Sequence, residues 1–313
     1  MGEFIDTSIK YSEIDNNSEL FADSCINQNN IYHYTSMSGL KGIVENESLW
    51  FTDIKYMNDM EEVKAGIDHA HEIVERMPED FKAKGKDALN HILDGEDRTF
   101  IACFSLDNDS LGLWNYYTKD INNSGINLSF DFKKLVKTTL VKNEVLDGCI
   151  LSCGIVDYST QFKNSYVDRS VKNLESLFLN FFKKNIPYVD VPVLIYDGVK
   201  KCFCYQPLKE IFFYVKRCCF RHENEFRIVI TVPKSKIEKI IKSGIYKFRE
   251  GNGVLIPYLD IKFDLTSING ITIAPTLKSD LIDRSLKDFF VYKGIDSNQL
   301  TEGVKRSVIP IRF

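Results

Sequence analysis

The chain has 313 residues, of which 44% are hydrophobic, 12% aromatic and 27% charged, and it carries a formal net charge of −4. This is the composition of an ordinary globular protein, and with only 8 prolines and 17 glycines the chain is neither collagen-like nor largely disordered. The acidic balance argues against a general nucleic-acid coat protein but leaves room for a local basic groove.

Residues 1–29 are polar and rich in Asn, Asp and Ser, and we interpret them as a variable N-terminal arm. They show neither the basic start nor the apolar run of a signal peptide, and the densest apolar stretch, Leu177–Phe182, is far too short to span a membrane. We therefore expect a cytoplasmic protein with no membrane partner. The 8 cysteines lack the paired spacing of a zinc site, which favours reduced thiols and no metal.

The first half of the chain alternates strands and helices. Strands are predicted at 31–35, 48–53 and 98–105 from their apolar and β-branched runs. A short helix after Ser36 would place Leu40, Ile43 and Val44 on one face. Two further helices are predicted over about 63–77 and 81–93, and a helical turn follows Asp109 or Ser110.

The second half supplies more strands around a helical segment. Strands are predicted at 125–131, 149–158, 223–232, 245–249, 253–258 and 268–274, with a helix at 279–291 and a mainly helical stretch at 168–219. Gly251-Asn252-Gly253 is typical of a hairpin turn rather than of a phosphate-binding loop. The pattern predicts an α+β fold: one domain over 30–313, a mixed or antiparallel sheet, and a helical insertion at about 159–220.

The segment ENEFRIVI at 223–230 is the most informative for chemistry. Alternation along a strand puts Phe226, Ile228 and neighbouring apolar residues on one face, and Glu223, Glu225 and Arg227 on the other. If the charged face is solvated, it is ordinary surface charge. If it lines a cleft, Arg227 would hold one of two mutually repelling carboxylates.

Two other segments carry candidate site residues. In IYHYT, His33 faces away from Tyr32 and Tyr34 at the end of a polar arm, where either a structural or a functional histidine can lie. In CFSLDNDSLGLWNYY, the strand ends at Ser105 and a turn follows with Trp114 and nearby tyrosines. Such rings are usually core, but they can also form a stacking surface for a flat ligand.

Several common signatures are missing, including the P-loop, the dinucleotide fingerprint, the zincin helix and the nucleophile elbow. The segment YMNDMEE, which contains Asn58, Asp59, Glu61 and Glu62, is explained by a turn followed by a helix start.

An ordered set of motifs resembles a widespread bacterial domain-of-unknown-function family. The set comprises IYHYTS at 31–36, N-D with a following Glu at 58–62, CFS with D-S-L-x-L-W-x-x-Y at 103–117, G-x-x-L-x-F at 125–130, E-x-E-x-R-I at 223–228 and S-x-x-P-x-R at 307–312. The resemblance covers residues 31–313. One departure is Ala274-Pro275, where members of the family usually carry Gly-Pro.

The layout of that family is in turn similar to the ADP-ribosyltransferase fold, with its split sheet. Enzymes of that fold carry a His or Arg on the first strand, an aromatic or Ser position next and a Glu on a later strand. The matching positions here are His33, Ser105 with Tyr116 or Tyr117, and Glu225 with Glu223.

The resemblance implies an effector of the toxin or antiviral-defence type that uses NAD as its substrate and transfers ADP-ribose to a protein or nucleic acid. Glu225 would stabilise the positive charge that develops on the ribose when nicotinamide leaves, and Glu223 would position or deprotonate the acceptor. His33 would hold a ribose hydroxyl and Arg227 would pair with a carboxylate or phosphate. The remaining candidate NAD-binding residues are Tyr34, Thr35, Ser105, Trp114 and Tyr117.

Two alternatives stay open. One is a metal-dependent nuclease or hydrolase that uses Asp59, Glu62, Glu223 and Glu225, although their spacing does not indicate a metal site. The other is a non-catalytic nucleotide- or peptide-binding module in which His33 and the acidic row are structural.

Overall fold

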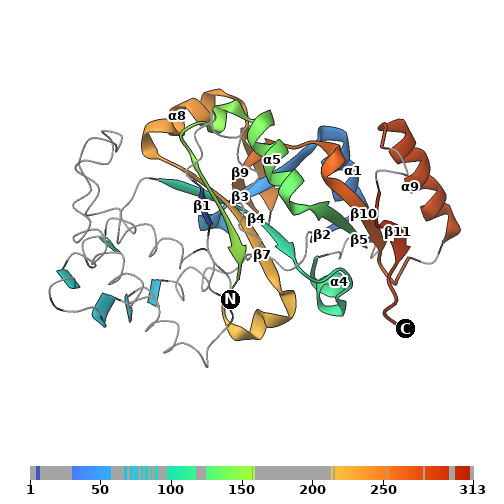
Figure 1. Cartoon of the computed structure of the whole chain (residues 1–313), viewed down its shortest axis with the longest axis horizontal. Helices are drawn as coiled ribbons and strands as arrows, with labels where there is room; N and C mark the ends of the chain where they lie inside the picture. The colour runs from blue at the N-terminus through green and yellow to red at the C-terminus, as the bar shows by residue number, and fades with distance from the viewer. Residues whose placement is uncertain are drawn as a thin grey trace. The chain divides into compact units, whose positions relative to one another are not determined.

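The computed structural model in Figure 1 describes residues 5–7, 30–57, 97–117, 125–156, 158, 213, 216–251, 253–277, 279–295 and 300–310, with scattered positions between 67 and 90. The chain divides into two compact units. The first contains residues 1–56, 97–155 and 221–313, and the second contains 57–96 and 156–220. We expected one domain with a single insertion at 159–220; in the structure, residues 57–96 group with that segment.

The described strands of the first unit form one mixed sheet, in the order β1-β6-β7-β4-β2-β5-β10-β11 with β3, β9 and β8 as a branch. Among the described pairs, only β10 and β11 run parallel. The strands are β1 (Ile5–Thr7), β2 (Asn30–Ser36), β3 (Ser48–Asp53), β4 (Arg98–Ser105), β5 (Gly125–Asp131), β6 (Ile150–Ile155), β7 (Glu225–Val232), β8 (Tyr246–Gly251), β9 (Val254–Lys262), β10 (Ile268–Ile273) and β11 (Gly303–Arg306). The α+β class is therefore confirmed.

The sheet forks at β4. One edge of this strand pairs with β7 along its whole length, from Arg98 to Ser105. The other edge pairs with β3 at Phe100 and Ile101, and then with β2 at Ser105 alone. Because β3 and β2 occupy different parts of one edge, the sheet divides there into a β2-β5-β10-β11 branch and a β3-β9-β8 branch.

The helices begin where the sequence provides side-chain caps. The described α-helices are α1 (Met37–Asn46), α4 (Leu111–Tyr117), α5 (Phe132–Lys142), α8 (Lys234–Lys242) and α9 (Asp280–Tyr292). Ser36, Asp131 and Ser279 each accept a backbone N–H at the start of α1, α5 and α9. No helix in the described part of the chain is long and apolar enough to cross a membrane.

The two faces of the sheet differ in character. The face that we call the core face carries Ile31, Phe104 and Phe226 and packs against Leu40 of α1 and Leu135 of α5. The other face, which we call the opposite face, carries a smaller apolar cluster made of Tyr32, Tyr34, Leu113, Trp114 and Ala274. Alternation along β2, β4 and β7 produces this division, since successive side chains point to opposite sides.

Most predicted strands of this unit agree with the structure, and three coincide with it at both ends: β3, β4 and β5. The charged strand begins at Glu225 rather than Glu223. Glu223 closes the 3-10 helix η6 (Cys218–Glu223), and Asn224 has the left-handed backbone angle φ 43°. Alternation along β7 therefore does not determine which way the Glu223 side chain points, although our prediction for Glu223 was based on it.

The structure also contains elements that we did not predict. α5 places Phe132, Leu135, Val136 and Thr139 on its buried side at helical spacing, and α8 follows Pro233. Residues 5–7 of the expected arm form β1, which pairs with β6. The predicted helices at 63–77 and 81–93 lie mostly outside the described residues, as does the helical segment at 168–219.

Candidate functional site

Four polar residues form a row across the opposite face. The strand register aligns Glu225 with Ser105, Ser105 with Tyr32, and Tyr32 with Ser129. Directly paired residues in a sheet point to the same side, and neighbouring strands lie about 4.8 Å apart. The predicted Ser and Glu positions are thus immediate neighbours at one end of β4 and β7, two strands that lie side by side in Figure 1.

Glu225 and Arg227 form a buried ion pair beside this row. The two residues are 4% and 2% exposed respectively. Arg227 donates from Nε to Glu225 Oε1 at 2.8 Å and from Nη2 to Oε2 at 2.9 Å. This two-point geometry fixes the carboxylate in position. The charged side of β7 is therefore buried, and the solvated-surface interpretation is wrong.

Glu223 lies close to the same end of the sheet. Its side chain accepts a hydrogen bond from Tyr117 Oη at 3.2 Å, and its carbonyl oxygen accepts one from Ser105 Oγ at 2.7 Å. The residue is 7% exposed, whereas Tyr117 is 47% exposed. The structure thus brings three predicted site residues into contact: Ser105, Tyr117 and Glu223.

The loop at 106–110 follows Ser105 of the row and is held by side chains from β2 and β5. Tyr34 Oη donates to the carbonyl of Asp107 at 2.8 Å and accepts the N–H of Ser110 at 3.0 Å. Asn127 donates to the carbonyl of Asn108 at 2.7 Å. These bonds satisfy backbone groups of a tight loop and fix it against β2 and β5.

Asp109 connects this loop to the C-terminal segment. Its Oδ1 accepts from Trp114 Nε1 at 2.7 Å and from Ser307 Oγ at 2.6 Å, and its Oδ2 accepts from the N–H of Val308 at 2.9 Å. Ile309 packs on the Trp114 cluster. The motif segments around 34, 109, 114 and 307 therefore meet in one structural network.

The aromatic candidates divide into buried and exposed rings. Tyr34 and Trp114 are 8% and 4% exposed and pack edge to face with a centroid distance of 4.7 Å. Burial raises the pKa of the Tyr34 hydroxyl. Tyr116 is 68% exposed, and the centroid of its ring lies 5.7 Å from that of the exposed His222 ring. Of the predicted stacking rings, only Tyr117 and its neighbour Tyr116 are accessible.

Gly112 permits the close approach of His222. A Cβ atom at this position would lie 2.8 Å from His222 Cδ2. Neither residue was among our predicted site residues, and the sequence contains no local signal that joins them, since they are more than 100 positions apart.

His33 points away from the other candidate residues. It pairs with Leu128 and shares the core face with Ile31, so its ring lies on the side of the sheet away from Glu225. The imidazole is half-buried at the fork beside β4, where Nδ1 lies 3.1 Å from the carbonyl oxygen of Cys103. Burial lowers the pKa of His33, so the neutral ring donates from Nδ1.

Thr35 is the other predicted site residue that lies apart from the row. By alternation it shares the side of β2 that carries His33. A Cβ atom added to Gly39 of α1 would overlap with Thr35 Oγ1. The contact to a helical glycine indicates a packing role between β2 and α1.

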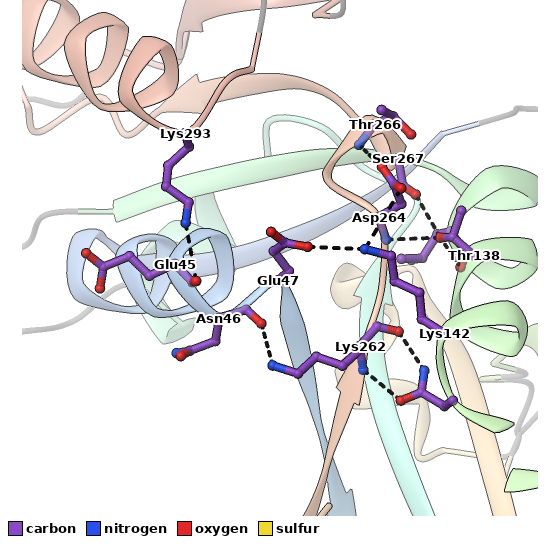
Figure 2. A network of polar contacts seen from close by, with 12 residues as sticks. Glu45, Asn46, Glu47, Thr138, Lys142, Lys262, Asp264, Thr266, Ser267 and Lys293 are labelled. Carbon is purple, nitrogen blue, oxygen red and sulfur yellow. Dashed lines mark hydrogen bonds and ion pairs between the residues drawn. The ribbon is translucent and has the colours of Figure 1, made fainter. Parts of the chain in front are cut away.

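A separate pocket of about 360 Å³ is lined by Glu45, Asn46, Glu47, Lys142 and Lys262. Two contacts join residues of this lining (Figure 2): the Lys262 ammonium donates to the carbonyl of Asn46 at 2.6 Å, and Lys142 donates to Glu47 Oε2 at 3.1 Å. Lys293 donates to the carbonyl of Glu45 at 3.4 Å. Lys262 and Lys293 thus satisfy carbonyls at the C-terminus of α1, where cations also complement the helix dipole. None of the predicted site residues lines this pocket.

A metal-dependent reaction receives no support from the described side chains. Among them, no group of three or more His, Cys, Asp or Glu residues could hold a metal ion. Two residues of the hydrolase alternative, Asp59 and Glu62, lie outside the described part of the chain.

Comparisons with protein-family models, with curated proteins and with solved structures give no match to this chain. The site has therefore to be interpreted from its own geometry.

Proposed function

We propose that this chain is an NAD-dependent ADP-ribosyltransferase-like effector of the toxin or antiviral-defence type. It would cleave the bond between nicotinamide and ribose and transfer ADP-ribose to a protein or nucleic acid. The observation that carries the proposal is the adjacency of β2, β4 and β7, which aligns Tyr32, Ser105 and Glu225 at one end of the sheet. The resemblance requires its three motif strands to lie near one another, and here they are neighbours in a forked sheet.

The proposed chemistry uses a fixed carboxylate. Nicotinamide leaves as a neutral ring, so the positive charge develops on the ribose carbon and no general acid is needed. Glu225, oriented by Arg227, supplies a negative charge at a defined place. Removing one preorganised electrostatic group of this kind typically costs about 100-fold or more in rate.

The residues around this carboxylate take the remaining roles. Glu223, held by Tyr117, would position the acceptor nucleophile. The exposed rings of Tyr116 and Tyr117 would receive the nicotinamide, because Trp114 is buried. His33 would act through the sheet fork by positioning β2 against β4, rather than by touching the ribose.

The test is nicotinamide release from NAD by the full chain, with and without cell lysate as a source of acceptor. Glu225→Gln and Glu223→Gln should each reduce release by about 100-fold, whereas Glu238→Gln, on the exposed side of α8, should not. Circular dichroism and the melting temperature separate lost chemistry from lost folding, which matters for Glu225 because its partner is buried. Unchanged release in both site variants, or no release by the wild type under either condition, would overturn the proposal.

One observation favours a second candidate, a non-catalytic nucleotide- or peptide-binding module. Arg227 binds both oxygens of Glu225. The motif residues Tyr34, Asp109 and Trp114 form hydrogen bonds that hold the loop at 106–110 in place. Calorimetry with NAD in the same series distinguishes the two candidates: binding without nicotinamide release indicates a module.

A further inference from the structure

The β3-β9-β8 branch presents a polar and aromatic surface on its side away from the core. The strand register aligns Trp50 with Asp260, Thr52 with Tyr258, and Lys247 with Tyr258. Leu49, Phe51, Leu259 and Ile261 occupy the core side of the same strands. We call the other side the Trp50 surface: Trp50, Thr52, Lys247, Arg249, Tyr258 and Asp260.

Trp50 is the central residue of this surface. It is 52% exposed, although most large aromatic side chains of the first unit are buried. Its ring lies against Tyr258, with a centroid distance of 4.6 Å and an interplanar angle of 36°. Tyr258 is only 6% exposed, so it supports the indole from the sheet side. One ring face of Trp50 is thus supported, and the side chain still has half of its area in solvent for a second planar group.

Two cations of β8 lie on the same side of the branch as the tryptophan, with β9 between their strand and β3. The ammonium of Lys247 pairs with Asp260, but the lysine side chain is 47% exposed and the aspartate side chain only 8%. Arg249 makes one long contact, from Nη2 to Thr52 Oγ1 at 3.4 Å, and its buried Nε has no hydrogen-bond partner among the described residues. With two cations against one buried anion, the surface is locally positive on a chain whose net charge is −4.

We propose that the Trp50 surface binds single-stranded nucleic acid. A base would stack on Trp50, and the adjoining phosphates would contact Arg249 and Lys247. A sheet surface that combines an exposed aromatic ring with nearby cations suits an unpaired strand, because every base has a stacking face and every linkage carries a negative charge. The proposal is independent of NAD cleavage, since none of these residues belongs to the row of Glu225.

The arrangement favours a nucleic acid over a lipid surface. Two exposed apolar residues of the β8-β9 hairpin, Phe248 and Leu255, lie on the other side of these strands by alternation, and a third, Val254 beside the turn, shares the side of Trp50. A membrane would engage Phe248 and Leu255, whereas a nucleic-acid strand needs the ring and the cations on one side. The same strand β8 therefore offers a matched control, because Phe248 is also an exposed aromatic, at 56%.

The experiment measures fluorescence anisotropy of labelled 12-nucleotide oligo-U, oligo-dT and duplex DNA with the full chain at 50 and 200 mM salt. We expect both single strands to bind more tightly than the duplex, and Trp50→Ala to weaken that binding about 10-fold, in line with the stacking energy of one base. Arg249→Gln and Lys247→Gln should each reduce the dependence of log K on log salt by about 0.7. Phe248→Ala and Lys242→Gln should leave binding unchanged.

Several outcomes would overturn the proposal. They are the absence of single-strand binding at micromolar protein, equal loss in Trp50→Ala and Phe248→Ala, and binding to phosphatidylserine vesicles that requires Phe248 instead. Self-association detected by light scattering and lost in Trp50→Ala would assign the surface to a second copy of the chain. Nicotinamide release by Trp50→Ala is measured in parallel. Because this assay does not depend on nucleic-acid binding, it distinguishes a failure of this proposal from a failure of the proposed function.

Discussion

Glu225 and Arg227 are held together in a place where neither charge would be stable alone. Moving two ions out of water costs several kcal/mol for each, and their attraction offsets this cost only when the geometry is good. Two short N–H···O bonds supply that geometry, at 2.8 and 2.9 Å. Such a pair adds little net stability, but it fixes where the carboxylate lies, which is what a transition-state contact requires.

His33 makes a prediction about pH at the same scale. Burial lowers its folded-state pKa below the ordinary value of about 6.5, so the unfolded chain binds more protons between the two values. The free energy of unfolding should therefore fall as the pH drops below about 6.5, with a slope of at most about 1.4 kcal/mol per unit from this residue. Urea unfolding of His33→Gln at pH 7.5 and 5.5 should show a smaller difference than the wild type.

The exposed Phe248, whose side chain does not ionise, provides the control for this experiment. Phe248→Ala should retain the wild-type difference between the two pH values. If His33→Gln loses as much stability on acidification as the wild type does, the lowered pKa of His33 is not the cause of the acid sensitivity.

The loop at 106–110 shows how one irregular segment can organise several strands. It receives hydrogen bonds from Tyr34 of β2, Asn127 of β5 and Asn224 before β7, and Asp109 ties it to the segment after β11. Each bond contributes about 1 kcal/mol on its own, and more where a charged acceptor is involved. The loop therefore contributes to stability by connecting several strands, although its sequence is that of a surface turn. We call it the loop joint.

Replacing Asp109 tests this joint. Asp109→Ala removes the acceptor of Trp114 Nε1, Ser307 Oγ and the Val308 N–H, and should lower the free energy of unfolding by about 2–3 kcal/mol. Hydrogen exchange should accelerate at 307–309 more than in β4. The exposed Asp288→Asn in α9 is the control and should change neither quantity. Protection at 307–309 equal to that of the wild type would show that the segment is held by other contacts.

At the scale of the whole molecule, the first unit is assembled from chain segments that are distant in sequence. Paired residues of β4 and β7 are 120 to 134 positions apart in the sequence, and those of β2 and β5 are about 95 apart. Loop closure must precede these contacts, so such a topology folds slowly.

We expect refolding from urea to require milliseconds to seconds. Stopped-flow fluorescence can follow it, because the chain has two tryptophans, Trp114 buried and Trp50 exposed. Trp50→Phe leaves Trp114 as a single reporter of the loop joint. Complete recovery of its signal within the dead time of about a millisecond would contradict a mechanism limited by long-range strand pairing.

The sequence by itself determined the elements of this protein. Apolar and β-branched runs identified β3 and β4 to the residue, alternation identified β5, and caps such as Ser36 located helix starts, because these signals arise within a few residues of the chain. It also assigned Phe226 and Ile228 to an apolar side of β7, as the core shows. The helical spacing of the apolar residues in α5 is an equally local signal, and the helix could have been predicted from the sequence.

Only the tertiary structure decided what the candidate residues touch. Alternation relates His33 to Tyr34 on one strand, but only pairing between strands puts His33 on the core face and Glu225 on the other. The left-handed Asn224 turns Glu223 out of the strand pattern, and the fork at β4 gives His33 a carbonyl partner. These features depend on register between segments about 70 to 190 residues apart, and no local pattern encodes that register.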